Sequence, residues 1–87
     1  MTTDDQFGIY DAVTRKRISY GRMSEPERFQ LYNAVGVYIG YGIFSGSDIF
    51  YIYDLQGKKI SYGLMDGTQE FTVYDDERNR IAYGVRE

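Results

Sequence analysis

The chain has 87 residues, with ten Lys and Arg against thirteen Asp and Glu, a formal net charge of −3, and neither Cys nor His. Without Cys and His it lacks disulfides, the usual zinc ligands, and the usual nucleophiles and general bases near neutral pH. We therefore expect a protein that is not an enzyme and that holds no metal or other cofactor. The negative charge repels phosphate backbones, so we expect no nucleic-acid partner.

The start of the chain has no basic and apolar regions of the kind found in a secretory signal. We expect residues 1–6 to be a disordered tail and the protein to be cytoplasmic. The longest apolar run, Leu31–Phe44, is interrupted by Asn33 and by glycines, and it is shorter than the roughly 18 residues that a membrane-spanning helix needs. We therefore expect no membrane partner.

A pattern that begins with Phe and ends in Tyr-Gly recurs four times along the chain. Each copy begins with Phe, a variable residue, an aliphatic residue, Tyr, and Asp or Asn. A turn follows, and the copy then continues with Ile, a small residue, Tyr and Gly. The copies begin at Phe7, Phe29, Phe50 and Phe71, which gives periods of 22, 21 and 21 residues. Repeats of this length are single supersecondary units that bury one face against their neighbours. We expect one domain over residues 7–87, with units 7–28, 29–49, 50–70 and 71–87.

Each copy alternates apolar and other residues on both sides of its turn, which predicts two half-buried strands. Helices are disfavoured because each of the ten glycines would cost a helix interior about 1 kcal/mol relative to Ala. The prediction is an all-β fold of four β-hairpins that form an eight-stranded antiparallel meander.

The turns predict the strand register. Asp54–Gly57 fits a type I turn with a G1 bulge, and Asp66-Gly67 fits a two-residue hairpin turn. These turns place Tyr62 opposite Phe50 within its hairpin and opposite Phe71 across the link. Two inward rows follow. The aromatic row is Phe7, Tyr20, Phe29, Tyr41, Phe50, Tyr62, Phe71 and Tyr83, and the aliphatic row is Ile9, Ile18, Leu31, Ile39, Ile52, Ile60, Val73 and Ile81.

This register does not decide whether the sheet closes into a barrel. Its pairings run straight across the strands, whereas a barrel needs tilted strands and a fixed shear, which bulges can supply. The alternatives are a small barrel or an open sheet that is closed by folding over or by dimerisation. Residues 57–63, Gly-Lys-Lys-Ile-Ser-Tyr-Gly, are similar to the hairpins of MORN repeats, although Ser61 stands where that family prefers Gly. That resemblance implies an open repeat sheet and carries no function.

The first Tyr of each copy is predicted on the face opposite the inward rows, near small residues of the adjacent strand. One interpretation is that these rings cover cross-strand glycines. The other is a small repeat lectin-like module in which one ring per copy stacks on a sugar, with the sites Tyr10, Tyr32, Tyr53 and Tyr74.

The middle of the chain has no Lys or Arg between Phe29 and Gly57. It is predicted to display a central aromatic, charge-free sheet surface made by Tyr32, Tyr38, Phe44, Tyr51 and Tyr53. Large aromatic patches with few charges are typical of interface centres. We therefore expect a non-enzymatic protein-binding module, a small inhibitor or adaptor, whose partner is another protein or a second copy in a homodimer. A structural self-assembling subunit is the remaining alternative.

Overall fold

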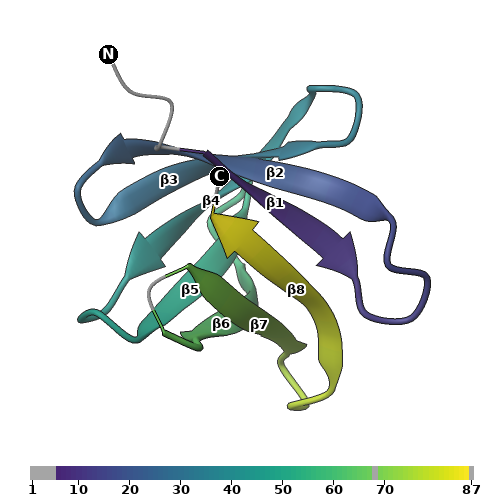
Figure 1. The fold of residues 1–87 in the computed structure, drawn as a ribbon. Helices are drawn as coiled ribbons and strands as arrows, with labels where there is room; N and C mark the ends of the chain where they lie inside the picture. Colours follow the sequence, from purple (N-terminus) through teal and green to yellow (C-terminus); the bar gives the residue numbers. More distant parts are fainter. Residues whose placement is uncertain (1–5, 68, 87) are drawn as a thin grey trace.

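The computed structural model describes residues 6–67 and 69–86, which form eight antiparallel strands in a closed barrel (Figure 1). The strands are β1 (Gln6–Asp11), β2 (Arg17–Glu25), β3 (Arg28–Asn33), β4 (Tyr38–Phe44), β5 (Ile49–Asp54), β6 (Lys59–Met65), β7 (Glu70–Asp75) and β8 (Arg80–Arg86). Of the tail expected at residues 1–6, only Gln6 lies within the described residues, and it begins β1.

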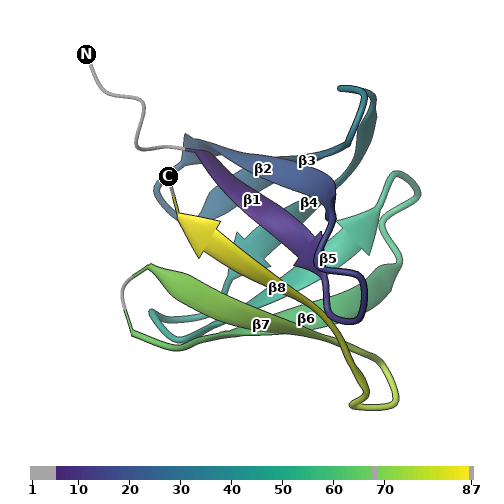
Figure 2. The ribbon, with the colours of Figure 1, turned by 45° about the vertical axis from the view of Figure 1, so that its right-hand side comes forward.

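The all-β meander of hairpins is confirmed, and of the predicted alternatives the small barrel is the one observed. Each strand pairs with the next in the chain, and β8 pairs with β1, with Phe7 opposite Arg86. The open sheet implied by the local resemblance is therefore wrong. Figure 2 shows the turns of the four hairpins at one end of the barrel and the links between hairpins at the other.

The predicted register is wrong by one residue in the second strand of every hairpin. Tyr53 pairs with Lys59, but Ile52 pairs with Ser61, so Ile60 is the extra residue of a β-bulge. The equivalent Ile18, Ile39 and Ile81 are skipped in the same way. Since side chains alternate between faces, a one-residue shift reverses the orientation of every later side chain. The four isoleucines therefore lie on the outside, 37–43% exposed.

The Asp66-Gly67 link is also longer than the two-residue turn that was predicted. The Asp66 N–H donates to the Glu70 carbonyl at 2.7 Å, and Met65 pairs with Phe71. Tyr62 consequently lies opposite Tyr74 instead of Phe71. The members of the predicted aromatic row that come from second strands all lie outside the barrel, namely Tyr20, Tyr41, Tyr62 and Tyr83.

The barrel interior is filled by four Phe side chains, one from the first strand of each hairpin. Phe7, Phe29, Phe50 and Phe71 form a closed ring of edge-to-face contacts, with centroids 4.9–5.4 Å apart and ring planes 83–87° apart. Each Phe lies against the Gly of a Tyr-Gly pair, and a Cβ at these glycines would overlap the ring. The second strands thus point small residues into the barrel, because the interior of an eight-stranded barrel has room for large side chains from only one strand of each hairpin.

The rest of the interior is equally closed. Below the Phe ring lies an aliphatic layer of Ile9, Leu31, Ile52 and Val73. Met23, Phe44 and Met65 pack against the core. The hollow that they line with Phe7, Phe50, Phe71 and Arg86 measures ≈ 10 Å³, at the limit for one water molecule. This hollow is therefore too small for a ligand.

The turn predicted at Asp54–Gly57 is confirmed, and Asn33–Gly36 has the same hydrogen bond from the Gly N–H to the first carbonyl. In the Asp54–Gly57 turn, the Gly57 N–H donates to the Asp54 carbonyl at 3.0 Å, and Asp54 Oδ1 accepts the N–H groups of Gln56 and Lys58, each at 2.9 Å. Gly36 and Gly57 adopt positive φ, +92° and +84°. Counted back from the second strand, this position is held by Arg78 in the last hairpin and by Arg15 in the first, whose turn is one residue longer. Their φ values are +70° and +63°, a region that costs a non-glycine residue stability.

Candidate functional site

The outer surface of the barrel carries tyrosines stacked in pairs. The pairs are Tyr20–Tyr32, Tyr41–Tyr53, Tyr62–Tyr74 and Tyr10–Tyr83, with centroids 5.2–5.5 Å apart and planes within 12–17° of parallel. Each pair joins the second strand of one hairpin to the first strand of the next. Each ring proposed for sugar stacking therefore has one face covered by another Tyr. These rings stack on each other and do not cover a cross-strand glycine with that face.

The five residues predicted to form the aromatic patch do not lie on one surface. Phe44 points inward, where its ring contacts those of Phe29 and Phe50 with centroids 6.1 and 5.1 Å apart. Its predicted place on the outer face is wrong, because the bulge at Ile39 reverses the faces of β4. The other four residues, Tyr32, Tyr38, Tyr51 and Tyr53, are outside and partly or well exposed.

Tyr32 and Tyr38 form the part of the predicted patch nearest the β3–β4 turn. Their rings are 5.8 Å apart and tilted by 54°. The Tyr32 hydroxyl donates to Gln30 Oε1 at 2.8 Å, and Tyr20 stacks on the Tyr32 ring. Tyr32 is therefore fixed in place, while Tyr38 is 42% exposed.

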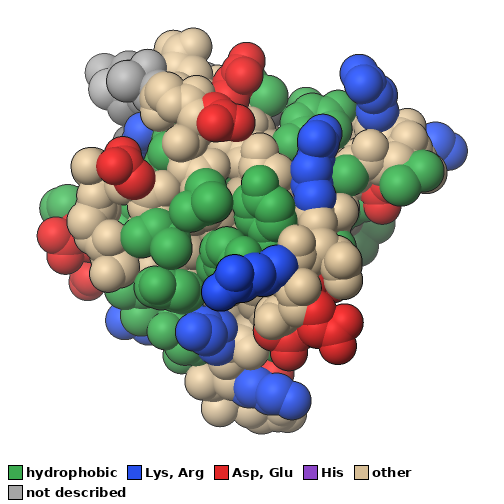
Figure 3. All heavy atoms as spheres, turned by 90° about the horizontal axis from the view of Figure 1, so that it is seen from below, with side chains coloured by type: hydrophobic (Ala, Val, Ile, Leu, Met, Phe, Trp, Pro, Cys, Tyr) green, Lys and Arg blue, Asp and Glu red, His purple; other side chains and the backbone are tan. Residues whose placement is uncertain are grey.

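Tyr51 and Tyr53 lie on β5, away from that cluster, and cations cover this part of the surface. Lys59 Nζ lies 4.6 Å from the centroid of the Tyr51 ring, and the Arg28 guanidinium lies 4.9 Å from that of Tyr41, which stacks on Tyr53. Such cation–π contacts are favourable and shield ring faces from other ligands. The surface is thus not free of charge, because neighbouring strands place Arg28 and Lys59 over it. Figure 3 shows Lys and Arg side chains lying across a cluster of hydrophobic ones on one face.

Comparison of the four hairpins with one another singles out the β3–β4 hairpin. The residue that pairs with the first Tyr is basic in three of them, Arg17, Lys59 and Arg80, and is Tyr38 in the fourth. The preceding position is Lys16, Lys58 or Asn79 in the others and Val37 here. This hairpin therefore has no charged residue from Asn33 to Phe44.

The β3–β4 hairpin also exposes its apolar side chains strongly. Val35 is 84% exposed and Val37 is 55% exposed. Neither residue was predicted as part of the contact surface, because that prediction was made from aromatic side chains. Aligning the four turns residue by residue gives the signal that finds them. We call Val35, Val37, Tyr38 and Ile39 the apolar hairpin surface.

Two turn carboxylates have an altered pKa. Backbone N–H groups of Thr14 and Val13 donate to Asp11 Oδ1 and lower the pKa of that carboxyl below its ordinary value. The N–H groups of Asn79 and Glu77 do the same for Asp75. Hydrogen bonds to the ionised form favour it. Both carboxylates are therefore fixed as turn acceptors.

The described residues include no group of three or more acidic side chains arranged to hold a metal ion. Among them, no helix is long and apolar enough to cross a bilayer. Comparison with known protein families, curated proteins and solved structures finds no significant match to this chain.

Proposed function

We propose that this protein is a non-enzymatic protein-binding module whose contact surface is centred on the apolar hairpin surface of β3–β4. The supporting observation is the difference between this hairpin and its three structural equivalents. The equivalents of Tyr38 in those hairpins are Arg17, Lys59 and Arg80, and those of Val37 are Lys16, Lys58 and Asn79. The fold therefore does not require apolar side chains at these two positions.

Contact of these apolar side chains with water is unfavourable, and burial against a partner removes that contact. Burial of apolar surface contributes about 25 cal/mol per Å², and clustered exposed apolar residues mark interaction surfaces. The hairpin is also rigid, because Asn33 Oδ1 accepts the N–H groups of Val35 and Val37, each at 3.0 Å. A preorganised contact surface loses little conformational entropy on binding.

The surroundings of the apolar hairpin surface indicate the chemistry of the partner. Ser19 pairs with Asn33 and Gly40 pairs with Asp54, so the β1–β2 and β5–β6 hairpins flank β3–β4. They carry Lys16 and Lys58 at the ends of their turns and Arg17 and Lys59 at the starts of β2 and β6. Complementarity of charge therefore favours a partner protein with an apolar centre and acidic side chains around it.

The lectin-like alternative has less support. A sugar stacks on an open ring face, and each of Tyr10, Tyr32, Tyr53 and Tyr74 has one face covered by its Tyr partner. The hydroxyl of Tyr32 is also already bonded to Gln30. Self-assembly through the apolar hairpin surface remains an alternative outcome of the same experiment.

The test replaces Val37-Tyr38 by the Lys-Lys pair of the β5–β6 hairpin, as the double variant Val37→Lys/Tyr38→Lys. The variant should fold, because Lys58 and Lys59 occupy the same positions in an equivalent hairpin. Val13→Ser is the matched control, since it removes an 88% exposed apolar side chain from another turn. Proteins captured from the native host are identified by mass spectrometry, and the affinity of the purified candidate is then measured by calorimetry.

We expect wild type and Val13→Ser to bind the same acidic protein and the double variant to bind it at least about tenfold more weakly, as for interface hot spots. Equal affinity of the double variant would refute the proposed contact surface. Light scattering is run in parallel. A wild-type dimer that becomes a monomer in the double variant would instead assign the surface to self-association.

A further inference from the structure

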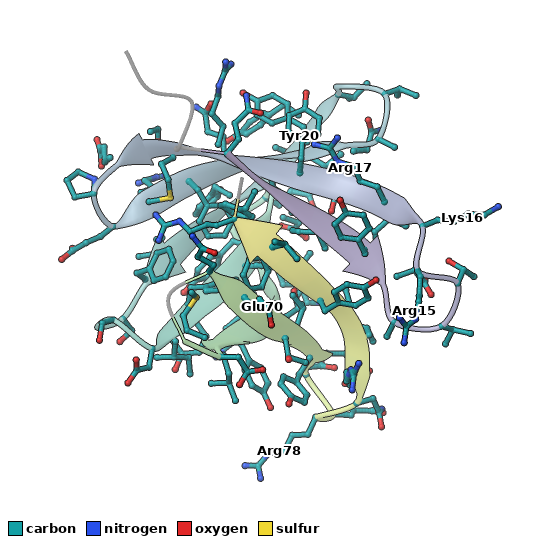
Figure 4. All side chains as sticks on the ribbon, in the orientation of Figure 1. Arg15, Lys16, Arg17, Tyr20, Glu70 and Arg78 are labelled. Carbon is teal, nitrogen blue, oxygen red and sulfur yellow. The ribbon has the colours of Figure 1, made fainter. Side chains whose placement is uncertain are left out.

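A hollow of ≈ 350 Å³ lies on the outer face of β7 and β8, separate from the apolar hairpin surface. Its charged lining residues are Arg15, Arg80, Asp66 and Glu70, and its polar side chains include Thr72 and Tyr83. Arg15 comes from the turn of the β1–β2 hairpin, which is next to β8 because the Ala12 N–H donates to the Ile81 carbonyl at 3.2 Å. Figure 4 shows Arg15 on this turn, well apart from Glu70.

The charges in this hollow are separated by sign. Glu70 is the first residue of β7, whereas Arg80 pairs with Tyr74 near the last. Four residues of strand span about 13 Å, so the cations are at one end of the hollow and the carboxylates at the other. Asp66, in the link before β7, accepts the Thr72 hydroxyl at Oδ2, at 3.4 Å. Within residues 6–67 and 69–86, neither Arg15 nor Arg80 forms an ion pair.

Every hairpin turn needs a left-handed residue at this position, and in the first turn that residue is Arg15, with φ of +63°, at a cost that Gly would not incur. Gly36 and Gly57 adopt the same left-handed conformation in the equivalent turns without a side chain. Non-glycine residues held in this region cluster at functional sites, where the rest of the fold compensates for the strain. An Arg at the position where Gly is the unstrained residue therefore indicates a role for the guanidinium group.

The same arrangement occurs a second time in the barrel. Arg78, the other residue with positive φ, lines a hollow of ≈ 360 Å³ on β5 and β6 together with Lys59 and Tyr62. Lys59 and Tyr62 are the repeat equivalents of Arg80 and Tyr83. In each hollow a left-handed Arg thus joins a second cation and a Tyr of the preceding hairpin. The two hairpin turns with Gly at this position have no side chain to contribute.

We propose that the Arg15 end of the β7–β8 hollow is a binding site for a phosphate group. Guanidinium groups match phosphate oxygens in geometry and form charge-assisted hydrogen bonds with them. Arg15 and Arg80 supply the charge, and the Tyr83 hydroxyl is a further donor. The β5–β6 hollow is the weaker copy, because Asp76 also lines it and Lys59 lies over the Tyr51 ring. This site is independent of the protein-binding surface proposed above.

The test is a titration of the ¹⁵N-labelled protein with sodium phosphate at constant ionic strength, followed by backbone and Arg Nε–Hε resonances. Sodium chloride is the control salt. N-acetyl-O-phosphoserine amide is titrated separately, because tighter binding of this compound indicates a phosphorylated partner, whereas tighter binding of phosphate indicates the free ion. We expect saturable shifts confined to Arg15, Arg80 and their neighbours on β7 and β8.

The key variant is Arg15→Gly, which restores the residue found at this position in two other turns and is therefore expected to fold. Loss of one charge-assisted contact should weaken phosphate binding about tenfold. Arg80→Gln should do the same without altering the turn. Arg22→Gln removes an exposed charge outside the hollow and should leave binding unchanged. Unchanged affinity in Arg15→Gly and Arg80→Gln, or equal shifts with chloride, would overturn the proposal.

Discussion

Substitution of Gly42 by Ala tests the packing of the barrel interior directly. A Cβ at residue 42 would overlap several atoms of the Phe29 ring. That ring is fully buried and has aromatic neighbours on three sides, Phe7 at 4.9 Å, Phe50 at 5.4 Å and Phe44 at 6.1 Å between centroids. These neighbours leave the Phe29 ring little room to move away from a new methyl group.

Overpacking of a well-filled core costs typically 1–3 kcal/mol, and we expect about 3 kcal/mol for Gly42→Ala because no relaxation is open to Phe29. For a domain of this size, that corresponds to a decrease in Tm of roughly 15 °C. Urea and thermal unfolding followed by circular dichroism measure both quantities. The matched control is Ser61→Ala. Ser61 points inward, and its equivalent in the last hairpin is Ala82, so this substitution should destabilise the protein by less than about 1 kcal/mol.

A double-mutant cycle with Phe29→Leu separates overpacking from a general intolerance of β4 to Ala. Phe29→Leu alone should destabilise the barrel by about 1–2 kcal/mol through lost burial. If the methyl group and the ring compete for one space, the double variant will be more stable than the sum of the single effects predicts, by at least about 1 kcal/mol. Additive effects, or a Gly42→Ala variant as stable as wild type, would show that Phe29 does not depend on a glycine opposite it.

Two further predictions concern the turns. Arg78→Gly should stabilise the protein by about 0.5 kcal/mol in urea unfolding, since relief of left-handed strain exceeds the entropy that Gly adds to the unfolded chain; a destabilised variant would contradict this. The pKa values of Asp11 and Asp75 are lowered from 3.8 by backbone N–H donors. The stabilisation is complete above the unfolded-state pKa and is lost as pH falls through the folded value. Replacing both by Asn, the residue at the equivalent Asn33, should therefore make the free energy of unfolding depend less on pH below 3.8. An unchanged pH dependence would count against this account.

The sequence predicts the hairpins well because their signals are local. Asp54 and Gly57 specify a turn by their own hydrogen bonding and backbone preference, and the repeat extends the result to the other units. Register is different, because the second strands have residues that fit either face. Ile60 and Tyr62 are more hydrophobic than Ser61 and Gly63, so hydrophobicity alone orients the strand incorrectly.

Interior volume is the property that decides the register, and it depends on all the hairpins together. Phe50 occupies the space that a Tyr62 inside the barrel would need, so the bulge at Ile60 turns Ser61 and Gly63 inward. The same reversal explains why Tyr32 and Tyr38 were placed correctly on the outside and Phe44 was not. No single strand contains that information.

The closed ring of perpendicular Phe side chains has a consequence for connectivity. Phe71 meets Phe7 at 5.3 Å and 87°, close to the 4.9–5.4 Å and 83–84° of the contacts between consecutive hairpins. The seam between the first and last strands is therefore equivalent to the three internal junctions. A circular permutant, with its old ends joined and a different link cut, would preserve every ladder and every ring contact. The architecture thus does not dictate which of the four units comes first along the chain.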